Sequence, residues 1–203
     1  MGTALPLFGT GLGLAAGAGL NAYAVLLVYG GVSRLFPEAF PGPISRLLAT
    51  TPALLVAGAL FLLEFVADKI PGLDHFWHLL HSVVRPLVGA LLAVASVAPE
   101  ESRLLDLLAG GGGGVVALVA HLMKSATRLT STALTAGVAN AALSLAEDIL
   151  AFLQSLVAIF LPMVALLVVA ALGVLFLATV PRIARFVNLF GRRRGADAGG
   201  GTP

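Results

Sequence analysis

Long apolar runs alternate with short charged segments along the chain. Residues 5–33 and 155–180 contain no charged side chain. A helix needs about 20 residues to cross the roughly 30 Å apolar core of a bilayer. Each of these two runs therefore predicts one membrane-spanning helix, and Pro162 predicts a kink or a tilt in the second.

The uncharged runs between them are too short to cross a bilayer alone. The run 52–63 ends at Glu64, and the run 86–98 begins directly after Arg85. To reach about 20 residues, a helix over either run must include its charged neighbours. We therefore expect four further spans, at about 52–69, 76–98, 107–126 and 133–153. Together they carry Glu64, Arg85 and Glu147 into the apolar layer.

The composition favours a protein that folds in lipid. The chain has 203 residues, of which 59% are hydrophobic and 11% charged, and its mean hydropathy is +1.02. Soluble domains carry about 25% charged residues, so that class is excluded. There is no cysteine, which excludes disulfides, thiolate metal sites and a cysteine nucleophile.

These features predict an all-α integral membrane protein with about six transmembrane helices, some of them short or broken. We expect one transmembrane domain over residues 1–190, followed by a disordered, basic and glycine-rich tail over residues 191–203.

The distribution of basic residues predicts an orientation. With six spans, both termini lie on the same side of the membrane. That side carries Lys69, Arg85, Lys124, Arg128, Arg182, Arg185, Arg192, Arg193 and Arg194, whereas the other side carries Arg34, Arg46 and Arg103. Because cytoplasmic loops are enriched in lysine and arginine, we expect both termini in the cytoplasm.

The two halves of the chain, residues 5–98 and 107–180, resemble each other weakly. Each begins with a glycine-rich helix and continues with a helix that carries two acidic residues, in "LEFVAD" (63–68) and "SLAED" (144–148). Three spans per half would give two inverted repeats, an arrangement common in transporters. The alternative is a chance similarity between two apolar segments rich in glycine and alanine.

Ionisable side chains inside a membrane cost at least about 2.5–3.5 kcal/mol each, so we expect them to face one another or a wet cavity. Glu64 and Asp68 share one helix face, as do Asn140, Ser144 and Asp148. The candidate ion or solute pathway comprises Asn21, Glu64, Asp68, Lys69, Asp74, His81, Arg85, Lys124, Arg128, Asn140, Glu147 and Asp148. The acids would bind or relay protons or cations, and the bases would balance charge or bind anions. Alternatively, these charges only pair and hold the helices together.

A weaker signal concerns a metal site. Asp74, His78 and His81 fall at helical spacing on one face, and such side chains can bind a divalent metal. The alternative is an interfacial amphipathic helix anchored by Trp77. No cofactor is expected.

Several segments resemble a known family. They are "GLNAY" (19–23), "EFVADKIPGLDHFWHLLHSVVRPLVGAL" (64–91), "HLMKSATR" (121–128) and "SLAED" (144–148). They are similar to an uncharacterised family of small multi-span membrane proteins of bacteria and plastids, marked by the motif E-x-x-A-D-K-x-P-x-x-D-x-x-W. His78 stands where the family usually has aspartate, which weakens the metal hypothesis. The resemblance implies a membrane location, here a bacterial inner membrane, and no substrate.

We therefore expect a small transporter or channel-like protein for an ion or a small polar solute. One alternative is a non-transporting membrane scaffold or assembly factor. Another is an enzyme acting on lipid head groups, but no nucleophile and base stand at motif spacing, so enzymatic activity is not expected. A homodimer is plausible through the glycines of the first span or the last helix. Nucleic acid is not an expected partner, because the "GRRRG" segment (191–195) suits anionic lipid better.

Overall fold

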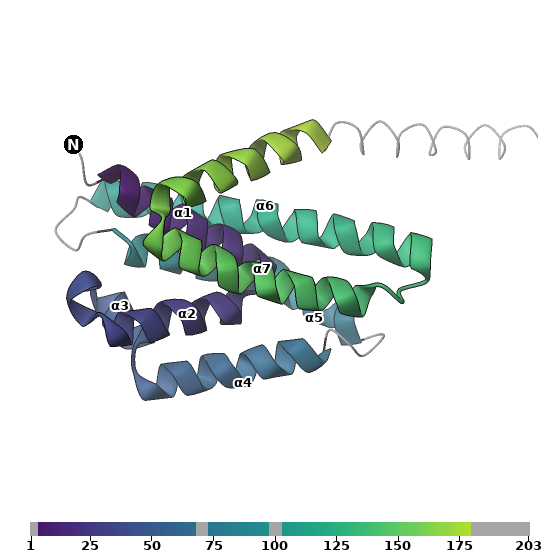
Figure 1. Ribbon diagram of the computed structural model, residues 1–203, viewed down its shortest axis with the longest axis horizontal. Coiled ribbons are helices and arrows are strands. Elements are labelled where there is room, and N and C mark those ends of the chain that lie inside the picture. The colour runs from purple at the N-terminus through teal and green to yellow at the C-terminus, as the bar shows by residue number, and fades with distance from the viewer. Residues whose placement is uncertain (1–3, 68–72, 98–102, 180–203) are drawn as a thin grey trace, which may run out of the picture.

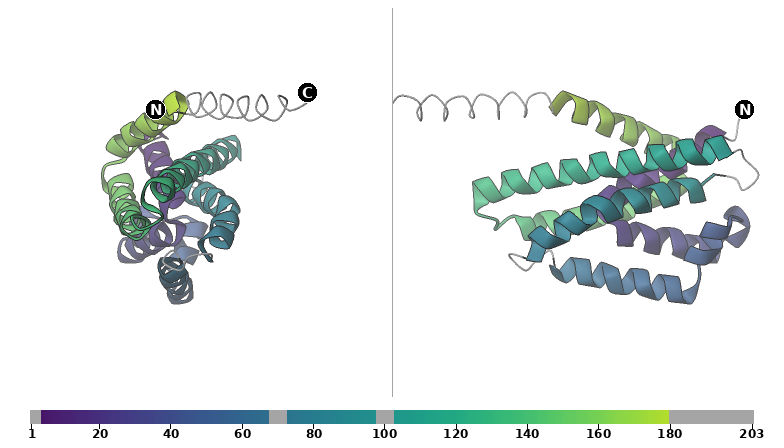
Figure 2. Two further views of the ribbon diagram at one scale, coloured as in Figure 1. Left: turned by 90° about the vertical axis from the view of Figure 1, so that its right-hand side faces the viewer. Right: turned by 180° about the vertical axis from the view of Figure 1, so that it is seen from behind.

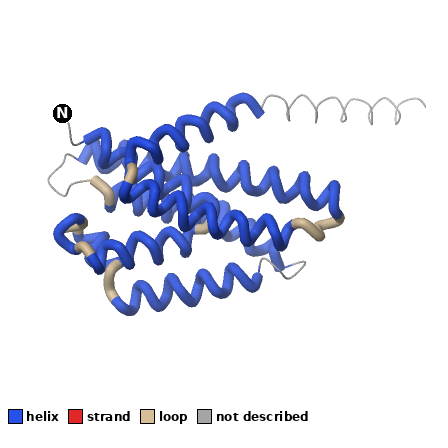
Figure 3. The backbone as a smooth tube through the Cα atoms, in the orientation of Figure 1, coloured by secondary structure: helices blue, strands red, loops and turns tan. Residues whose placement is uncertain are grey.

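The computed structural model describes residues 4–67, 73–97 and 103–179, and within these ranges every regular element is a helix (Figures 1 and 3). The elements are α1 (Ala4–Leu20), α2 (Ala22–Leu35), the 3-10 helix η1 (Pro37–Ala39), α3 (Pro43–Leu48), α4 (Thr51–Ala67), α5 (Leu73–Ala95), α6 (Arg103–Thr135) and α7 (Asn140–Phe160), followed by a last helix, Pro162–Thr179. The predicted all-α fold is confirmed for this part of the chain.

The first expected span is not one helix, because the chain breaks at Asn21. The backbone of Asn21 is extended, with φ −148° and ψ 105°. Its side-chain oxygen accepts hydrogen bonds from the amides of Tyr23 (3.1 Å) and Ala24 (3.0 Å). These are two of the amide groups at the start of α2 that lack a partner within the helix, so Asn21 is the N-cap of α2.

Helix α2 reverses the direction of α1. Gly11 of α1 lies against Ala93 of α5, and Gly19 lies beside Arg85, so α1 and α5 run antiparallel. On α2, Tyr23 contacts His81 near the start of α5, and the hydroxyl of Tyr29 donates to the carbonyl of Ala95 at its end.

Helix α2 therefore runs parallel to α5 and antiparallel to α1. We call α1 and α2 together the hairpin. It enters and returns at the end of the molecule where α3 lies (Figures 1 and 2). Asn21, at its tip between the two helices, is fully buried. The expectation of one continuous span over residues 5–33 was wrong.

The later boundaries also differ from the expected ones. Helix α6 continues to Thr135, beyond the expected end at 126, and the turn that follows contains Ala136 and Gly137, both with positive φ. Helix α7 begins at Asn140 instead of 133 and ends at Phe160. The kink expected at Pro162 is a complete break at Leu161, after which the last helix begins.

Close packing explains the run of glycines in α6. Residues 110–114 are all glycine, yet they stay helical. A Cβ atom on Gly113 would lie 2.5 Å from the Cβ of Ala93 and 2.6 Å from the carbonyl oxygen of Gly89. Glycine at this position therefore lets the backbones of α5 and α6 approach closely, as small residues do between helices in lipid.

The hairpin occupies the centre of the molecule. Helix α1 contacts α5, α6 and α7, and its glycines also meet the last helix, where Gly9 lies against Pro162 and Gly13 against Ala165. The fully buried apolar residues around it are mostly small, and large ones such as Leu14 and Leu92 are few.

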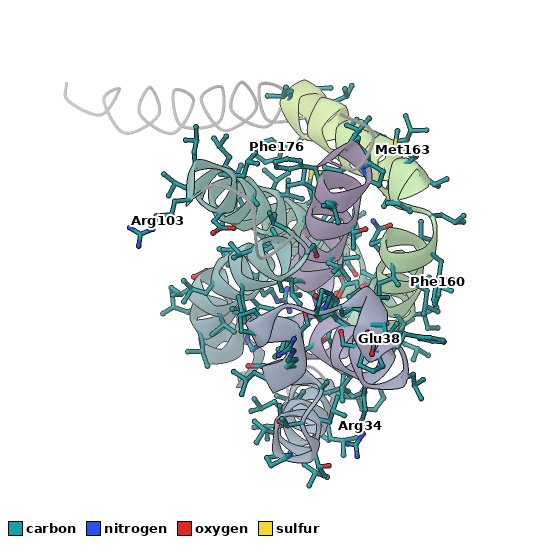
Figure 4. The ribbon with its side chains drawn as sticks, turned by 90° about the vertical axis from the view of Figure 1, so that its left-hand side faces the viewer. Arg34, Glu38, Arg103, Phe160, Met163 and Phe176 are labelled. Atoms are coloured by element: carbon teal, nitrogen blue, oxygen red, sulfur yellow. The ribbon has the colours of Figure 1, made fainter. Side chains whose placement is uncertain are left out.

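The outer surface is strongly apolar. Leu55, Leu107 and Leu167 are each about 70% exposed, at 68%, 72% and 71%, and Phe160 and Met163 project outward in Figure 4. Three of the described helices are long and apolar enough to cross a membrane, namely α6, α7 and the last helix. This surface is the reverse of that of a soluble protein, where charged residues are exposed.

Two glycines of α6 provide a matched test of this packing. Gly113→Ala introduces a methyl group into the contact with α5, and overpacking of this kind costs about 1–3 kcal/mol. Nothing lies within 4 Å of a Cβ atom on Gly111. We expect Gly111→Ala to stabilise the protein by about 0.5–1 kcal/mol, because alanine favours helix. Unfolding measured in detergent checks both, and equal effects of the two variants would contradict the packing.

Candidate functional site

Ionisable side chains converge on the tip of the hairpin. They come from α4, α5, α6 and α7, and each of these residues, taken as a whole, is at most 7% exposed. We call this group the charged cluster; it consists of Asn21, Glu64, His81, Arg85, His121, Lys124, Arg128, Glu147 and Asp148. Among these described residues, three carboxylates face three basic groups, so the formal charges balance when the histidines are neutral.

Arg85 links three elements in one half of the cluster. Its Nη2 donates to Oε1 of Glu64 on α4 at 2.5 Å. Its Nη1 lies 2.8 Å from Nδ1 of His121 on α6 and donates to the carbonyl oxygen of Gly19 at 3.0 Å. Because the guanidinium only donates, Nδ1 of His121 must accept, which makes this imidazole neutral.

The Glu64 carboxylate is incompletely paired within the described residues. His81 Nε2 lies 3.8 Å from Glu64 Oε1, beyond hydrogen-bond distance. Oε2 of Glu64 and Nε of Arg85 are buried and have no hydrogen-bond partner in the part of the chain that the structure describes. Buried polar atoms in this state are uncommon and often mark a functional group or a bound water.

Glu147 holds the other half of the cluster. Its Oε2 accepts from Arg128 Nη2 at 2.8 Å and from Arg128 Nε at 3.2 Å, and it lies 3.1 Å from Lys124 Nζ. Lys124 and Arg128 thus both contact Oε2 of Glu147, and we call these two residues the basic clamp. Lys124 Nζ also donates to the carbonyl oxygen of Leu20 at 2.7 Å. The neighbouring Asp148 accepts from the amide of Asn21 at 2.8 Å.

The two broken helix ends contribute to the electrostatics of the site. The last carbonyls of a helix lack intrahelical partners and carry a partial negative charge. At the end of α1, Gly19 and Leu20 direct such carbonyls to Arg85 and Lys124. At the start of α2, the side-chain oxygen of Asn21 accepts hydrogen bonds from the amides of Tyr23 and Ala24. The side-chain nitrogen of Asn21 donates to Asp148.

An apolar layer closes the charged cluster toward the α3 end of the molecule. Leu14, Val25 and Leu92 are fully buried in this layer. Beyond it, the hydroxyls of Tyr29 and Ser45 lie 2.7 Å apart, and Tyr29 bonds to the Ala95 carbonyl. The buried side chains between the charged cluster and these hydroxyls are therefore mostly apolar; the hydroxyl of Ser155, which also lies there beside Gly17 and Val25, donates to the carbonyl of Ala151 in its own helix.

A groove of about 510 Å³ lies on the opposite side of the cluster, between α6, α7 and the last helix. Its polar lining consists of the hydroxyls of Thr127, Thr130, Ser131, Thr135 and Thr179. Thr127 and Ser131 stand before and after Arg128 on α6, and the lining residue Leu143 precedes Glu147 by one helical turn. The groove therefore adjoins the half of the cluster that contains the basic clamp.

The structure brings together most of the residues expected to form a pathway, but not all. Asn140 lies outside the cluster: its amide donates to Thr132 at 2.8 Å, beside the turn that precedes α7. Asp68 and Lys69 lie outside the described residues.

The metal hypothesis concerned Asp74, His78 and His81 of α5. The side chains of Asp74 and His78 fall outside the described ones, while His81 is buried beside Glu64 and Tyr23. Among the described residues, no group of three or more potential metal ligands occurs. His121 belongs to the cluster although it was absent from the expected set; its spacing to Lys124 and Arg128, on one face of α6, was the available signal.

A double-mutant cycle tests the pair of Glu64 and Arg85. Removing one partner of a buried ion pair leaves an uncompensated charge, so we expect Glu64→Gln or Arg85→Gln to cost about 3–5 kcal/mol of stability. The double variant should lose much less than the sum of the two. Unfolding in detergent measures this, with the exposed Glu38→Gln as control. Additive losses would show that the two groups do not pair.

Comparison with known proteins places the chain in a family. No curated protein and no solved structure matches it. A family model described as "Domain of unknown function (DUF4126)" matches residues 8–182, a range that includes every member of the charged cluster and all of the hairpin except its first four residues. This agrees with the resemblance to an uncharacterised family that the sequence shows. The chain therefore belongs to the DUF4126 family of proteins with a domain of unknown function.

Proposed function

We propose that this protein is an integral membrane transporter that moves an ion or a small polar solute through the charged cluster. The observation that carries the proposal is the hairpin, whose two helix ends meet buried ionisable side chains in the interior. Broken helices of this kind build the substrate sites of many transporters, because their exposed backbone groups and dipoles bind charged species.

The distribution of side chains supports a bilayer as the partner. Leucine, valine and phenylalanine cover the outer surface, while Glu64, Arg85 and Lys124 are buried. In lipid, intramembrane ionisable residues face the interior of a bundle and mark ion pathways or proton relays. The same arrangement in water would expose an apolar surface far larger than soluble monomers tolerate.

The hairpin changes the expected topology. It enters and leaves at the α3 end, so it does not cross the membrane, whereas α4, α5, α6, α7 and the last helix each run between the two ends (Figure 1). Five crossings place the two termini on opposite sides. The α3 end carries Arg34, Arg46 and Arg103, and the chain after Thr179 carries five arginines. The distribution of basic residues then favours an external N-terminus and a cytoplasmic C-terminus in a bacterial inner membrane.

The closed layer and the groove favour a transporter over an open channel. In this topology Leu14, Val25 and Leu92 are buried on the external side of the cluster, and the groove lies toward its cytoplasmic side. Alternating access requires one side to be shut while the other is open. Movement of the hairpin against the surrounding helices would be needed to reverse this state.

A membrane scaffold without transport activity is the second candidate. The equal number of described acidic and basic groups in the cluster favours it, because fully paired charges can serve cohesion alone. Oε2 of Glu64 and Nε of Arg85, which have no hydrogen-bond partner among the described residues, favour transport instead. The predicted repeats and a homodimer remain compatible with both candidates.

Single cysteines can test the topology, since the chain has none of its own. Thr3→Cys precedes α1, Glu38→Cys lies in η1 and Val138→Cys lies in the turn before α7. In spheroplasts we expect a membrane-impermeant maleimide to label the first two and to label Val138→Cys only after lysis. Labelling of Glu38→Cys before lysis but of Thr3→Cys only after lysis would restore a crossing helix over residues 5–33.

Flux in liposomes tests transport itself. We expect liposomes with the purified protein to respond to an imposed gradient of at least one of sodium, potassium, proton, chloride, nitrate or phosphate. Glu64→Gln should lose this response, because it removes the anion that holds Arg85 at the hairpin tip, whereas Glu38→Gln should retain it. Absence of every flux, with protein that elutes and unfolds normally, would favour the scaffold.

A further inference from the structure

The two halves of the charged cluster differ in how their charges are matched. In one half, a single carboxylate, Glu64, meets a single guanidinium, Arg85. In the other half, one oxygen of Glu147 forms ion pairs with both members of the basic clamp. Two cations thus converge on one small anionic group, the geometry by which a lysine and an arginine bind a free anion.

Cation sites in the cluster are already occupied by groups of the protein itself. In a broken helix, the carbonyls at the end of the first segment are where a bound cation is expected. Here those carbonyls belong to Gly19 and Leu20, and they accept hydrogen bonds from Arg85 and Lys124. The exchangeable partner of the cluster is therefore an anion, and Glu147 occupies its place.

Resting on the proposed transport function, we propose that the basic clamp binds a small monovalent anion and that Glu147 is the internal anion which it displaces. Glu147 takes up one proton as the anion enters, so the charge of the cluster is unchanged. The transported unit is then one anion together with one proton. The pairing follows because Lys124 and Arg128 then face one ionised carboxylate of this half, Asp148, so a protonated Glu147 leaves one buried positive charge for the anion to balance.

The groove lies along the segment of α6 that carries the clamp. Arg128 and Glu147 are slightly more exposed than Glu64 and Arg85, with side chains 7% and 9% accessible against 1% and 2%. The volume of about 510 Å³ is within the range of small-molecule sites.

Lys124 connects the anion site to the hairpin. Its ammonium contacts both Glu147 and the Leu20 carbonyl, so a change of anion at the clamp changes a contact at the hairpin tip.

The protonation of Glu147 also depends on the other titratable or charged groups around it. These are Lys124, Arg128 and His121 on α6, Asp148 on α7, Arg85 on α5 and Glu64 on α4.

Anion-dependent unfolding tests the clamp without any transport measurement. The midpoint of thermal unfolding in detergent is compared in sodium nitrate, sodium chloride and sodium gluconate at equal ionic strength. For the wild type we expect nitrate and chloride to stabilise the protein more at pH 5 than at pH 8. In Glu147→Gln the stabilisation should be present at both values, because the clamp is permanently vacant, and Glu38→Gln should behave as the wild type.

Arg128→Gln should lose the anion effect, whereas Arg128→Lys should retain part of it. If Glu147→Gln does not fold, the proposal is still tested by comparing the wild type with Arg128→Lys. The anion effect on the unfolding midpoint at pH 5 should then be smaller in Arg128→Lys than in the wild type. Equal midpoints in all three salts at both pH values would overturn the proposal.

Proton coupling is then measured in liposomes with an entrapped pH-sensitive dye. An inward nitrate or chloride gradient should acidify the interior with the wild type and Glu38→Gln, and the acidification should be lost with Glu147→Gln. Nitrate-specific stabilisation without flux of any ion would support the anion site and overturn transport. Flux driven by sodium or potassium gluconate, without any anion effect on unfolding, would keep transport and overturn the anion proposal.

Discussion

Two backbone carbonyls at the end of α1 accept hydrogen bonds from buried basic side chains, and the interior is organised around this contact. Gly19 and Leu20 have no helical partner for these oxygens, since the chain reverses at Asn21. In an apolar interior such groups must be satisfied by protein. Arg85 and Lys124 satisfy them, and each then requires a carboxylate, which Glu64 and Glu147 provide.

The glycine content and the charged interior are two consequences of the same arrangement. A helix can lie at the centre of this bundle only if its neighbours approach closely, and Gly13 and Gly19 of α1 leave no room for a side chain. Small residues thus fill the core, and the large apolar ones face outward. Cohesion inside then depends on backbone contacts and on the paired charges, because few large side chains are available to pack.

Counting residues was sufficient to predict which charges enter the interior. The short apolar runs beside Glu64, Arg85 and Glu147 required these side chains to be included in helices, and all three are buried. The reversal was not predicted, because residues 5–33 are apolar on both sides of Asn21 and hydrophobicity carries no sign of direction. The capping preference of asparagine was the available local signal. Helix α6 extends beyond the expected end at 126, and within this extension the hydroxyls of Thr130 and Thr135 bond to carbonyls of their own helix.

Disulfide formation between Gly17→Cys and Val25→Cys tests the hairpin most directly. A Cβ atom on Gly17 would lie 3.1 Å from a side-chain methyl of Val25, whereas in a continuous helix the two positions are about 12 Å apart. The hairpin predicts that mild oxidation in the membrane joins the two cysteines, as seen by mass, while a Val83→Cys and Leu91→Cys pair within α5 stays reduced. Two free thiols at positions 17 and 25 under the same oxidation would contradict the hairpin and the site built on it.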